Sequence, residues 1–185
     1  MSESLFDVKP EVVTDAKVSQ CGTYRYWLTR VWDDSLPRLG WVMLNPSTAD
    51  ADVDDATIRR LAGSEKRPGF ARRWGFGGII VRNLYALRST DPKALVGHPD
   101  PVGPENDDEL ALAAYHEPLT MLAWGANAPT DRSQHVAKLL WMRSQIHGTR
   151  LAVLGWTKSG MPRHPLYVCQ DQEREYCDEG ELFDP

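Results

Sequence analysis

Four short apolar runs, each closed by turn residues, are the feature that most constrains how this chain can fold. They lie at residues 41–44, 77–85, 118–124 and 151–156. Apolar runs of this length are typical of strands buried on both faces, as in a parallel sheet. Helix caps and helical apolar spacing occur between them, so strand and helix alternate along the chain. This alternation predicts an α/β domain, a three-layer α/β/α sandwich around a central, mainly parallel four-stranded sheet.

The segments on either side of this core have different patterns. Residues 16–34 alternate in part around Cys21-Gly22, which predicts an N-terminal β-hairpin. Residues 1–15 are expected to form a flexible arm, and residues 16–170 a single α/β domain, because no linker or repeat divides them. Residues 171–185 hold seven acids and one base. They are expected to form an acidic tail at the surface that could contact a protein partner.

The charge balance narrows the classes of function. The chain has 21 basic and 26 acidic residues, and the acidic tail leaves 20 basic and 19 acidic residues in the rest. A nearly neutral body does not favour strong non-specific binding to DNA, although a local basic patch could contact a ligand phosphate. The basic cluster at residues 59–73 fits either a solvated helix face or such a phosphate contact.

The sequence also bears on compartment and redox state. No run of about 18 apolar residues is present to cross a membrane. The N-terminal residues lack the apolar core of a signal peptide, so a cytoplasmic location without membrane contact is expected. The three cysteines, Cys21, Cys169 and Cys177, form no CxxC pair. This indicates reduced thiols rather than a disulfide framework or a structural zinc site.

Polar residues follow each of the four predicted strands. Asn45-Pro46-Ser47 ends the first strand, since Pro46 cannot continue a ladder of hydrogen bonds. Asn83 lies near the end of the second, Trp124-Gly125 ends the third, and a loop containing His164 follows the fourth. Ligands in open α/β sheets bind at the carboxyl ends of the strands, so these residues are candidates for one site. Turn formation and helix capping would explain the same residue types without a ligand.

Taken in order, these motifs resemble those of the uracil-DNA glycosylase superfamily. Leu44-Asn45-Pro46-Ser47 resembles its first motif, Asn83 stands where the superfamily places its base-reading residue, and residues 122–128 and 163–167 resemble the third motif and the final loop. The resemblance covers about residues 41–167. Met43 stands near the place of a usual glycine, and Leu166 replaces a serine. The ligating cysteines of the iron–sulfur members are missing, so no cluster is expected.

The resemblance implies roles for these residues. Asn45 would orient a water molecule through its carbonyl oxygen, because an amide cannot act as a general base. His164 would donate a hydrogen bond to the departing base, which makes both residues catalytic candidates. The other candidates form three groups: base-binding Asn83, Ser47, Asp50 and Trp124; phosphate-binding Lys158, Arg163 and Arg59; and Leu166 or Tyr167 as the wedge that fills the gap of a flipped base.

Over its whole length the chain also resembles a family of small bacterial proteins of unknown function. The shared motifs are LNPSTADA at residues 44–51, DDxTIRR at 54–60, WGFGG at 74–78 and AWGA at 123–126. This likeness is closer than the likeness to glycosylases, and it implies no particular activity.

Two hypotheses on function follow. The first is a nucleobase- or nucleotide-recognising protein, an N-glycosidase (a hydrolase, with a role in DNA repair) acting on a nucleobase, nucleotide or DNA. The second is a non-catalytic nucleotide- or nucleic-acid-binding module, or a protein-interaction domain. No cofactor is expected, and no metal, since the acidic loop at residues 50–55 lacks the glycine and distal glutamate of a calcium loop. The first hypothesis requires Asn45, Asn83 and His164 to meet in one pocket.

Overall fold

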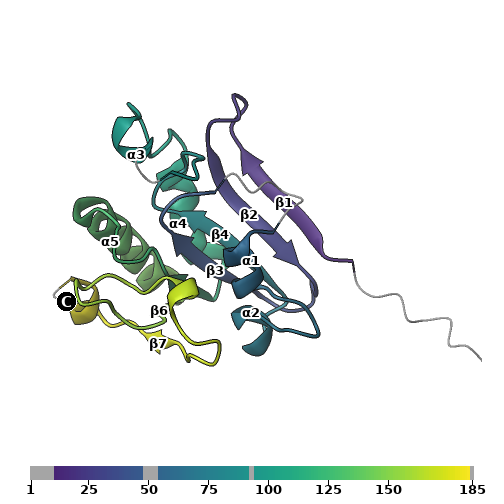
Figure 1. Cartoon of the computed structure of the whole chain (residues 1–185). Helices are drawn as coiled ribbons and strands as arrows, with labels where there is room; N and C mark the ends of the chain where they lie inside the picture. Colours follow the sequence, from purple (N-terminus) through teal and green to yellow (C-terminus); the bar gives the residue numbers. More distant parts are fainter. Residues whose placement is uncertain (1–10, 48–53, 92–93, 184–185) are drawn as a thin grey trace, which may run out of the picture.

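A computed structural model describes residues 11–47, 54–91 and 94–183 of the chain (Figure 1). Within these ranges, seven strands form one sheet in the order β1-β2-β4-β3-β5-β6-β7. Its centre consists of the four strands expected from the sequence, and these are parallel to one another: β4 (Gly78–Asn83), β3 (Arg38–Met43), β5 (Leu119–Leu122) and β6 (Arg150–Val153).

The prediction of a four-stranded sheet is wrong in the number of strands, because antiparallel strands extend both edges. On one side, β1 (Val13–Val18) and β2 (Arg25–Val31) form the expected hairpin, but β2 also pairs with β4. On the other side, β7 (Glu175–Tyr176) pairs with β6. Alternation within residues 16–34 could suggest the hairpin, but it carries no information about pairing with a strand 50 residues away.

Secondary structure is present in the described parts of both end segments, residues 11–15 and 171–183. The strand β1 begins at Val13, within residues 1–15. The acidic segment holds β7 and α6 (Glu179–Phe183), and Leu182 of α6 is buried beside α5 (Thr130–His147). Parts of this segment therefore pack onto the domain, and its contact with a protein partner stays a prediction.

Helices cover both faces of the sheet. On one face, α1 (Ala56–Leu61) and α2 (Phe70–Arg73) connect β3 to β4. On the opposite face, α4 (Asn106–His116) connects β4 to β5, and α5 connects β5 to β6. A short helix, α3 (Ala94–Gly97), precedes α4, and a 3₁₀ turn, η1 (Pro165–Tyr167), follows β6. In the described part of the chain, no helix is long and apolar enough to cross a membrane.

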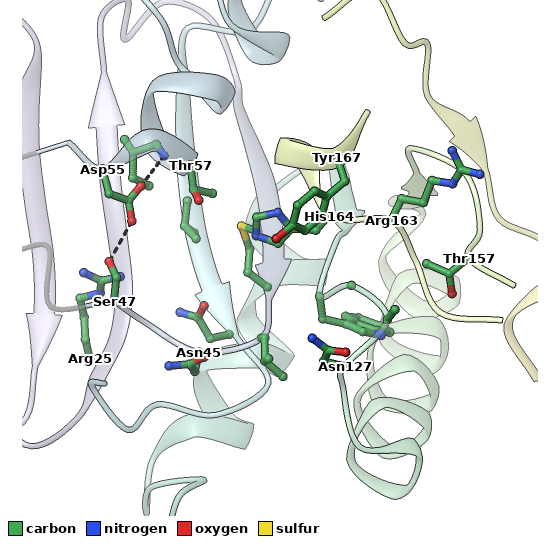
Figure 2. A pocket seen from close by; sticks show the side chains of 18 residues that line it. Arg25, Asn45, Ser47, Asp55, Thr57, Asn127, Thr157, Arg163, His164 and Tyr167 are labelled. Carbon is green, nitrogen blue, oxygen red and sulfur yellow. Dashed lines mark hydrogen bonds between the residues drawn. The ribbon is translucent and has the colours of Figure 1, made fainter. Parts of the chain in front are cut away.

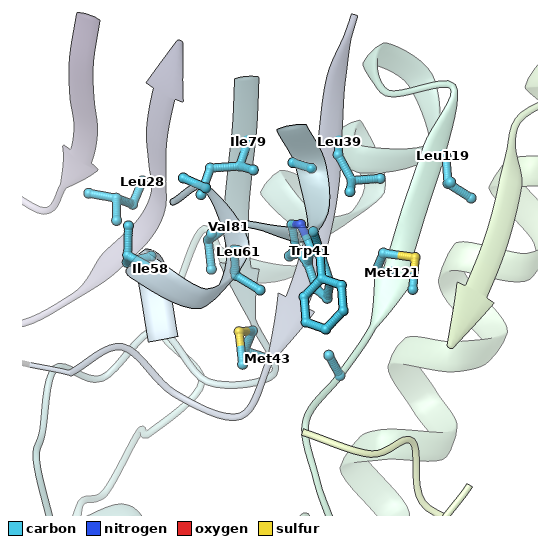
Figure 3. Close-up of a cluster of buried hydrophobic side chains, with 14 of the residues drawn as sticks. Leu28, Leu39, Trp41, Met43, Ile58, Leu61, Ile79, Val81, Leu119 and Met121 are labelled. Atoms are coloured by element: carbon cyan, nitrogen blue, oxygen red, sulfur yellow. The ribbon is translucent and has the colours of Figure 1, made fainter. Parts of the chain in front are cut away.

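The position of β3 inside the sheet, between two layers of helices, explains why its sequence is apolar without alternation. Trp41 and Met43 join the cluster under α1 and α2, which Figure 3 shows, whereas Val42 joins the cluster under α4 and α5. The Trp41 side chain is fully buried, and its ring lies 6.2 Å from that of Phe70 between ring centroids. A strand with helices on both faces buries every side chain, which is the pattern of a parallel α/β sheet.

One ion pair is buried within the domain. Arg82 of β4 donates from Nη1 to Oε2 of Glu117, which directly follows α4, at 2.9 Å. The two side chains are 4% and 1% exposed. Arg38 at the start of β3 places Nη2 3.7 Å from the other carboxylate oxygen. Because both charges are removed from water, the attraction between them has to offset the solvation that each has lost.

The connections place an opening at the end of β3. The chain leaves β3 for β4 over one face and passes from β4 to β5, the other neighbour of β3, over the opposite face. Such a reversal leaves a crevice at the carboxyl ends of the strands. Backbone hydrogen bonds keep these ends side by side: Leu84 N donates to Met43 O, and Ala123 N donates to Val42 O, each at 2.8 Å.

Candidate functional site

A cavity of about 590 Å³ opens at the carboxyl ends of β3, β4 and β5 (Figure 2). Its walls come from these strand ends, from the start of α1 and from the loops that follow β5 and β6. Asn45, Asn83 and His164 all line it. Three residues from separate parts of the sequence thus meet in one cavity.

The two asparagines differ in how they are held. Asn45 donates from Nδ2 to the carbonyl of Ser89 at 2.8 Å and to that of Pro46 at 3.3 Å. Its Oδ1 accepts no hydrogen bond from the described residues. Asn83 is 2% exposed, and its Nδ2 has no partner in the described part of the chain. A buried amide without a partner is costly, so a ligand that pairs with it would gain affinity.

His164 occupies the middle of the view in Figure 2. Its Nδ1 accepts a hydrogen bond from the backbone N–H of Leu166 at 3.3 Å, which caps η1. Burial lowers the pKa of His164, and the negative charge of Asp55 partly opposes this shift. The ring is therefore neutral near pH 7. With Nδ1 as acceptor, the proton of the neutral ring is on Nε2, which leaves that atom as a donor.

Gly125 allows the loops after β5 and β6 to approach each other. Its φ angle is 82°, and a Cβ atom at this position would lie 3.2 Å from Cβ of His164. Its N–H donates to the carbonyl of Pro162 at 2.9 Å. Any other residue would be strained in this conformation and would press on the histidine. The backbone conformation and the close contact with His164 thus explain why the third motif has a glycine at this position.

A carboxylate that the sequence did not single out as a site residue also lines the cavity. Asp55 precedes α1 and accepts a hydrogen bond on Oδ1 from Ile58 N and one on Oδ2 from Ser47 Oγ, each at 2.8 Å. Aspartate is a common residue type at a helix N-cap, so the capping role fits its type. Its place in the cavity depends on how α1 packs on the sheet, which no local pattern reveals.

Arg25 is a second lining residue that sequence reasoning missed. It is the first residue of β2, it is 4% exposed, and it lines the cavity. It reaches the cavity because β2 pairs with β4. Asn127, Thr57 and Thr157 complete the polar lining.

The remaining predicted site residues divide into three groups. Ser47, Trp124, Arg163 and Tyr167 line the cavity. Leu166, Lys158 and Arg59 do not: Leu166 is 43% exposed beside the cavity, and Arg59 donates to the backbone carbonyl of Asp54. Asp50 lies outside the described residues. The structure therefore brings most of the predicted base-binding residues together but only one of the three predicted phosphate contacts.

Arg60, from the basic cluster, ties the His164 loop to α1. Its guanidinium donates to the backbone carbonyls of Pro165, at 3.3 Å, and of Val168, and to the side chain of Gln170. These acceptors lie more than 100 residues away in the sequence. The cation thus fixes the loop that carries His164 rather than forming a solvated helix face.

We expect Arg60→Met to destabilise the protein by roughly 1–3 kcal/mol, because three acceptors lose a charged donor. Amide hydrogen exchange should accelerate at residues 166–170 and stay unchanged in β3. Arg59→Met is the matched control, since Arg59 is exposed and its side chain donates to the nearby backbone carbonyl of Asp54. Equal exchange in the two variants would show that Arg60 does not hold the loop.

No three or more His, Cys, Asp or Glu side chains among the described residues are placed to share a metal ion. Asp50 and Asp52 of the acidic loop lie outside those residues.

The chain matches the model of a family described as a protein of unknown function, DUF1643, over residues 25–166. It belongs to the DUF1643 family. The match includes every residue that lines the cavity except Tyr167. The expected membership in a family of unknown function is confirmed. No curated protein and no solved structure matches the chain. The cavity itself has to indicate what this DUF1643 protein does.

Proposed function

We propose that the protein is an N-glycosidase, which hydrolyses the bond between a nucleobase and its sugar, on a three-layer α/β/α fold like that of uracil-DNA glycosylases. The observation that supports this most is that Asn45, Asn83 and His164 line one cavity. Asn45 follows β3, Asn83 is the last residue of β4 and His164 lies in the loop after β6, and the reaction needs them together.

The chemistry makes three demands, and the lining offers a group for each. The departing base develops negative charge, which the N–H of a neutral His164 would stabilise. The attacking water must be oriented, and the Oδ1 of Asn45, which accepts no hydrogen bond from the described residues, is an acceptor for one of its protons. The correct base must be distinguished, and the buried amide of Asn83 offers both a donor and an acceptor to a base edge.

The cavity also suits the size of the substrate. Its volume of about 590 Å³ lies in the range of small-molecule sites, roughly 300–1,000 Å³. Apolar side chains of Met43, Ile58 and Val81 contribute to its walls, and such surfaces pack against the faces of a base. A single nucleoside, free or extruded from a strand, would fit.

The competing function is a binding module that recognises a nucleotide without cleaving it. One contact favours it: the Nδ2 of Asn45 is engaged by two backbone carbonyls, so this residue has a structural reason to be an asparagine. A module of this kind would keep the donor set of the cavity and bind nucleotides without releasing base.

The test is a base-release assay. The protein is incubated with single- and double-stranded DNA, free nucleosides and nucleotides that carry uracil, hypoxanthine, xanthine or mismatched bases, and the released base is separated and quantified. An Asn45→Ala, His164→Ala double variant, shown to be folded, is the control. We expect release from at least one substrate that the double variant does not support. Binding without release by the folded wild type would favour the binding module.

A further inference from the structure

The lining of the cavity contains one carboxylate among the described residues, that of Asp55. Base release makes the sugar carbon C1′ positive, and water must lose a proton as it attacks. Neither Asn45 nor Asn83 can accept that proton, and neither carries a negative charge. His164 would donate to the base, so it would stabilise the negative charge of the base and not the positive charge of the sugar. If the proposed function holds, the anion that the reaction requires has to come from elsewhere in the cavity wall.

The contacts of Asp55 hold its carboxylate in a fixed orientation. The N–H of Ile58 and the hydroxyl of Ser47 each donate to one of its oxygens at 2.8 Å. Each carboxylate oxygen has two lone pairs, so each can accept one more hydrogen bond. In Figure 2 the carboxylate stands beside Ser47 on the wall that also holds Thr57, with His164 further along the cavity. A fixed anion with spare acceptor capacity is what a water-activating group requires.

The neighbouring acid, Asp54, has a different environment. Its Oδ1 accepts from Nε of the buried Arg30 at 2.8 Å, and it does not line the cavity. The charge of Asp54 is thus used in an ion pair, whereas that of Asp55 acts within the cavity, where it also influences His164.

We propose that Asp55 is a further catalytic residue, which accepts a proton from the attacking water and stabilises the positive charge on the sugar. This inference rests on the proposed function. The water oxygen bonds to C1′ while the C1′–N bond breaks, and its electron pair leaves on the base. One water proton passes to Asp55 and the other remains on the new sugar hydroxyl. The base anion, hydrogen-bonded by His164, takes a proton from solvent, and Asp55 returns its proton to solvent.

The decisive variant is Asp55→Asn, because asparagine caps a helix about as well as aspartate but carries no charge. The substrate is the best one found in the base-release assay, and single-turnover rates are measured beside the affinity for that substrate. We expect the rate to fall about 100-fold, at the lower end of general-base contributions because Asn45 still orients the water. The affinity should stay within about threefold. Ser47→Ala, which leaves the charge but removes one hydrogen bond, should lose less.

Glu65→Gln is the matched control, since it removes one negative charge from an exposed position outside the cavity and should keep the wild-type rate. A rate for Asp55→Asn within threefold of wild type would overturn the role of Asp55 and leave the N-glycosidase standing. An equal loss of affinity and rate would make Asp55 a binding residue and overturn it as well. A folded wild type that releases no base from any substrate would overturn both proposals.

Discussion

His164→Asn is expected to lower the rate of base release by 10²–10³-fold, the usual effect of removing one donor to a developing oxyanion. Asparagine can keep the local contact, because its Oδ1 can replace Nδ1 of His164 as the acceptor for Leu166 N–H. It is too short to place a donor where Nε2 lies. The variant therefore removes the hydrogen-bond donor while it keeps the contact that holds the loop in place.

His164→Gln is the partner variant for this test. The longer amide reaches further into the cavity, so its NH₂ can replace Nε2 in part, and we expect it to recover at least tenfold over asparagine. Single-turnover rates on the best substrate measure both. A rate for His164→Asn within threefold of wild type would show that no negative charge develops next to the His164 side chain during the reaction.

The depressed pKa of His164 also predicts a stability effect with a definite sign. In the unfolded chain the ring takes up a proton at about pH 6.5, whereas burial keeps the native ring neutral to lower pH. The unfolded state then binds more protons, so the contribution of His164 to stability is present above pH 6.5 and is lost as pH falls below it. The stability of wild type relative to His164→Asn, from urea unfolding, should decrease between pH 7.5 and 5.

Glu117→Ala is expected to destabilise the protein by about 3–5 kcal/mol, because it leaves the guanidinium of Arg82 buried without a counter-charge. For a chain of this length, the melting temperature should fall by roughly 6–20 °C. Differential scanning calorimetry measures it. The variant lies on the face of the sheet away from α1, so any base release by the fraction that remains folded should be unchanged.

Two controls make the interpretation of Glu117→Ala specific. Arg82→Met combined with Glu117→Leu removes both charges and should regain most of the lost stability, as apolar replacements of buried pairs do. Glu105→Ala breaks the exposed pair with Lys17 and should change stability by less than about 1 kcal/mol. A loss in the double variant as large as in Glu117→Ala would show that an unpaired charge on Arg82 does not explain the effect.

The central strands were predictable because their signal is local. Apolar runs closed by Asn45-Pro46, Asn83 or Gly125 fix where each strand ends, and the end is where a parallel sheet places its polar residues. The same signal predicted which residues would meet at the cavity. The partner of an edge strand is not local, so neither the pairing of β2 with β4 nor the resulting position of Arg25 could be derived.

The side chains misjudged from the sequence share one property, which is that more than one role fits their type. Asp55 has a residue type that commonly caps helices, and it caps α1, but it also lines the cavity. Arg60 belonged to a cluster of cations that suggested solvent or phosphate, and it binds carbonyl oxygens of a loop far away in the sequence. Only tertiary packing decides between such roles.

The hydrogen bonds of Arg60 have a consequence for selectivity. α1 directly follows Asp55 on one wall of the cavity, and η1 directly follows His164 on another, so one guanidinium joins the two walls before any ligand arrives. The hydrogen bonds of Arg60 therefore hold the width of the cavity between these two walls constant. If the proposed function holds, a base that is too wide would be rejected by size rather than accommodated by movement, and a base that fits would bind without the entropy loss of ordering a loop.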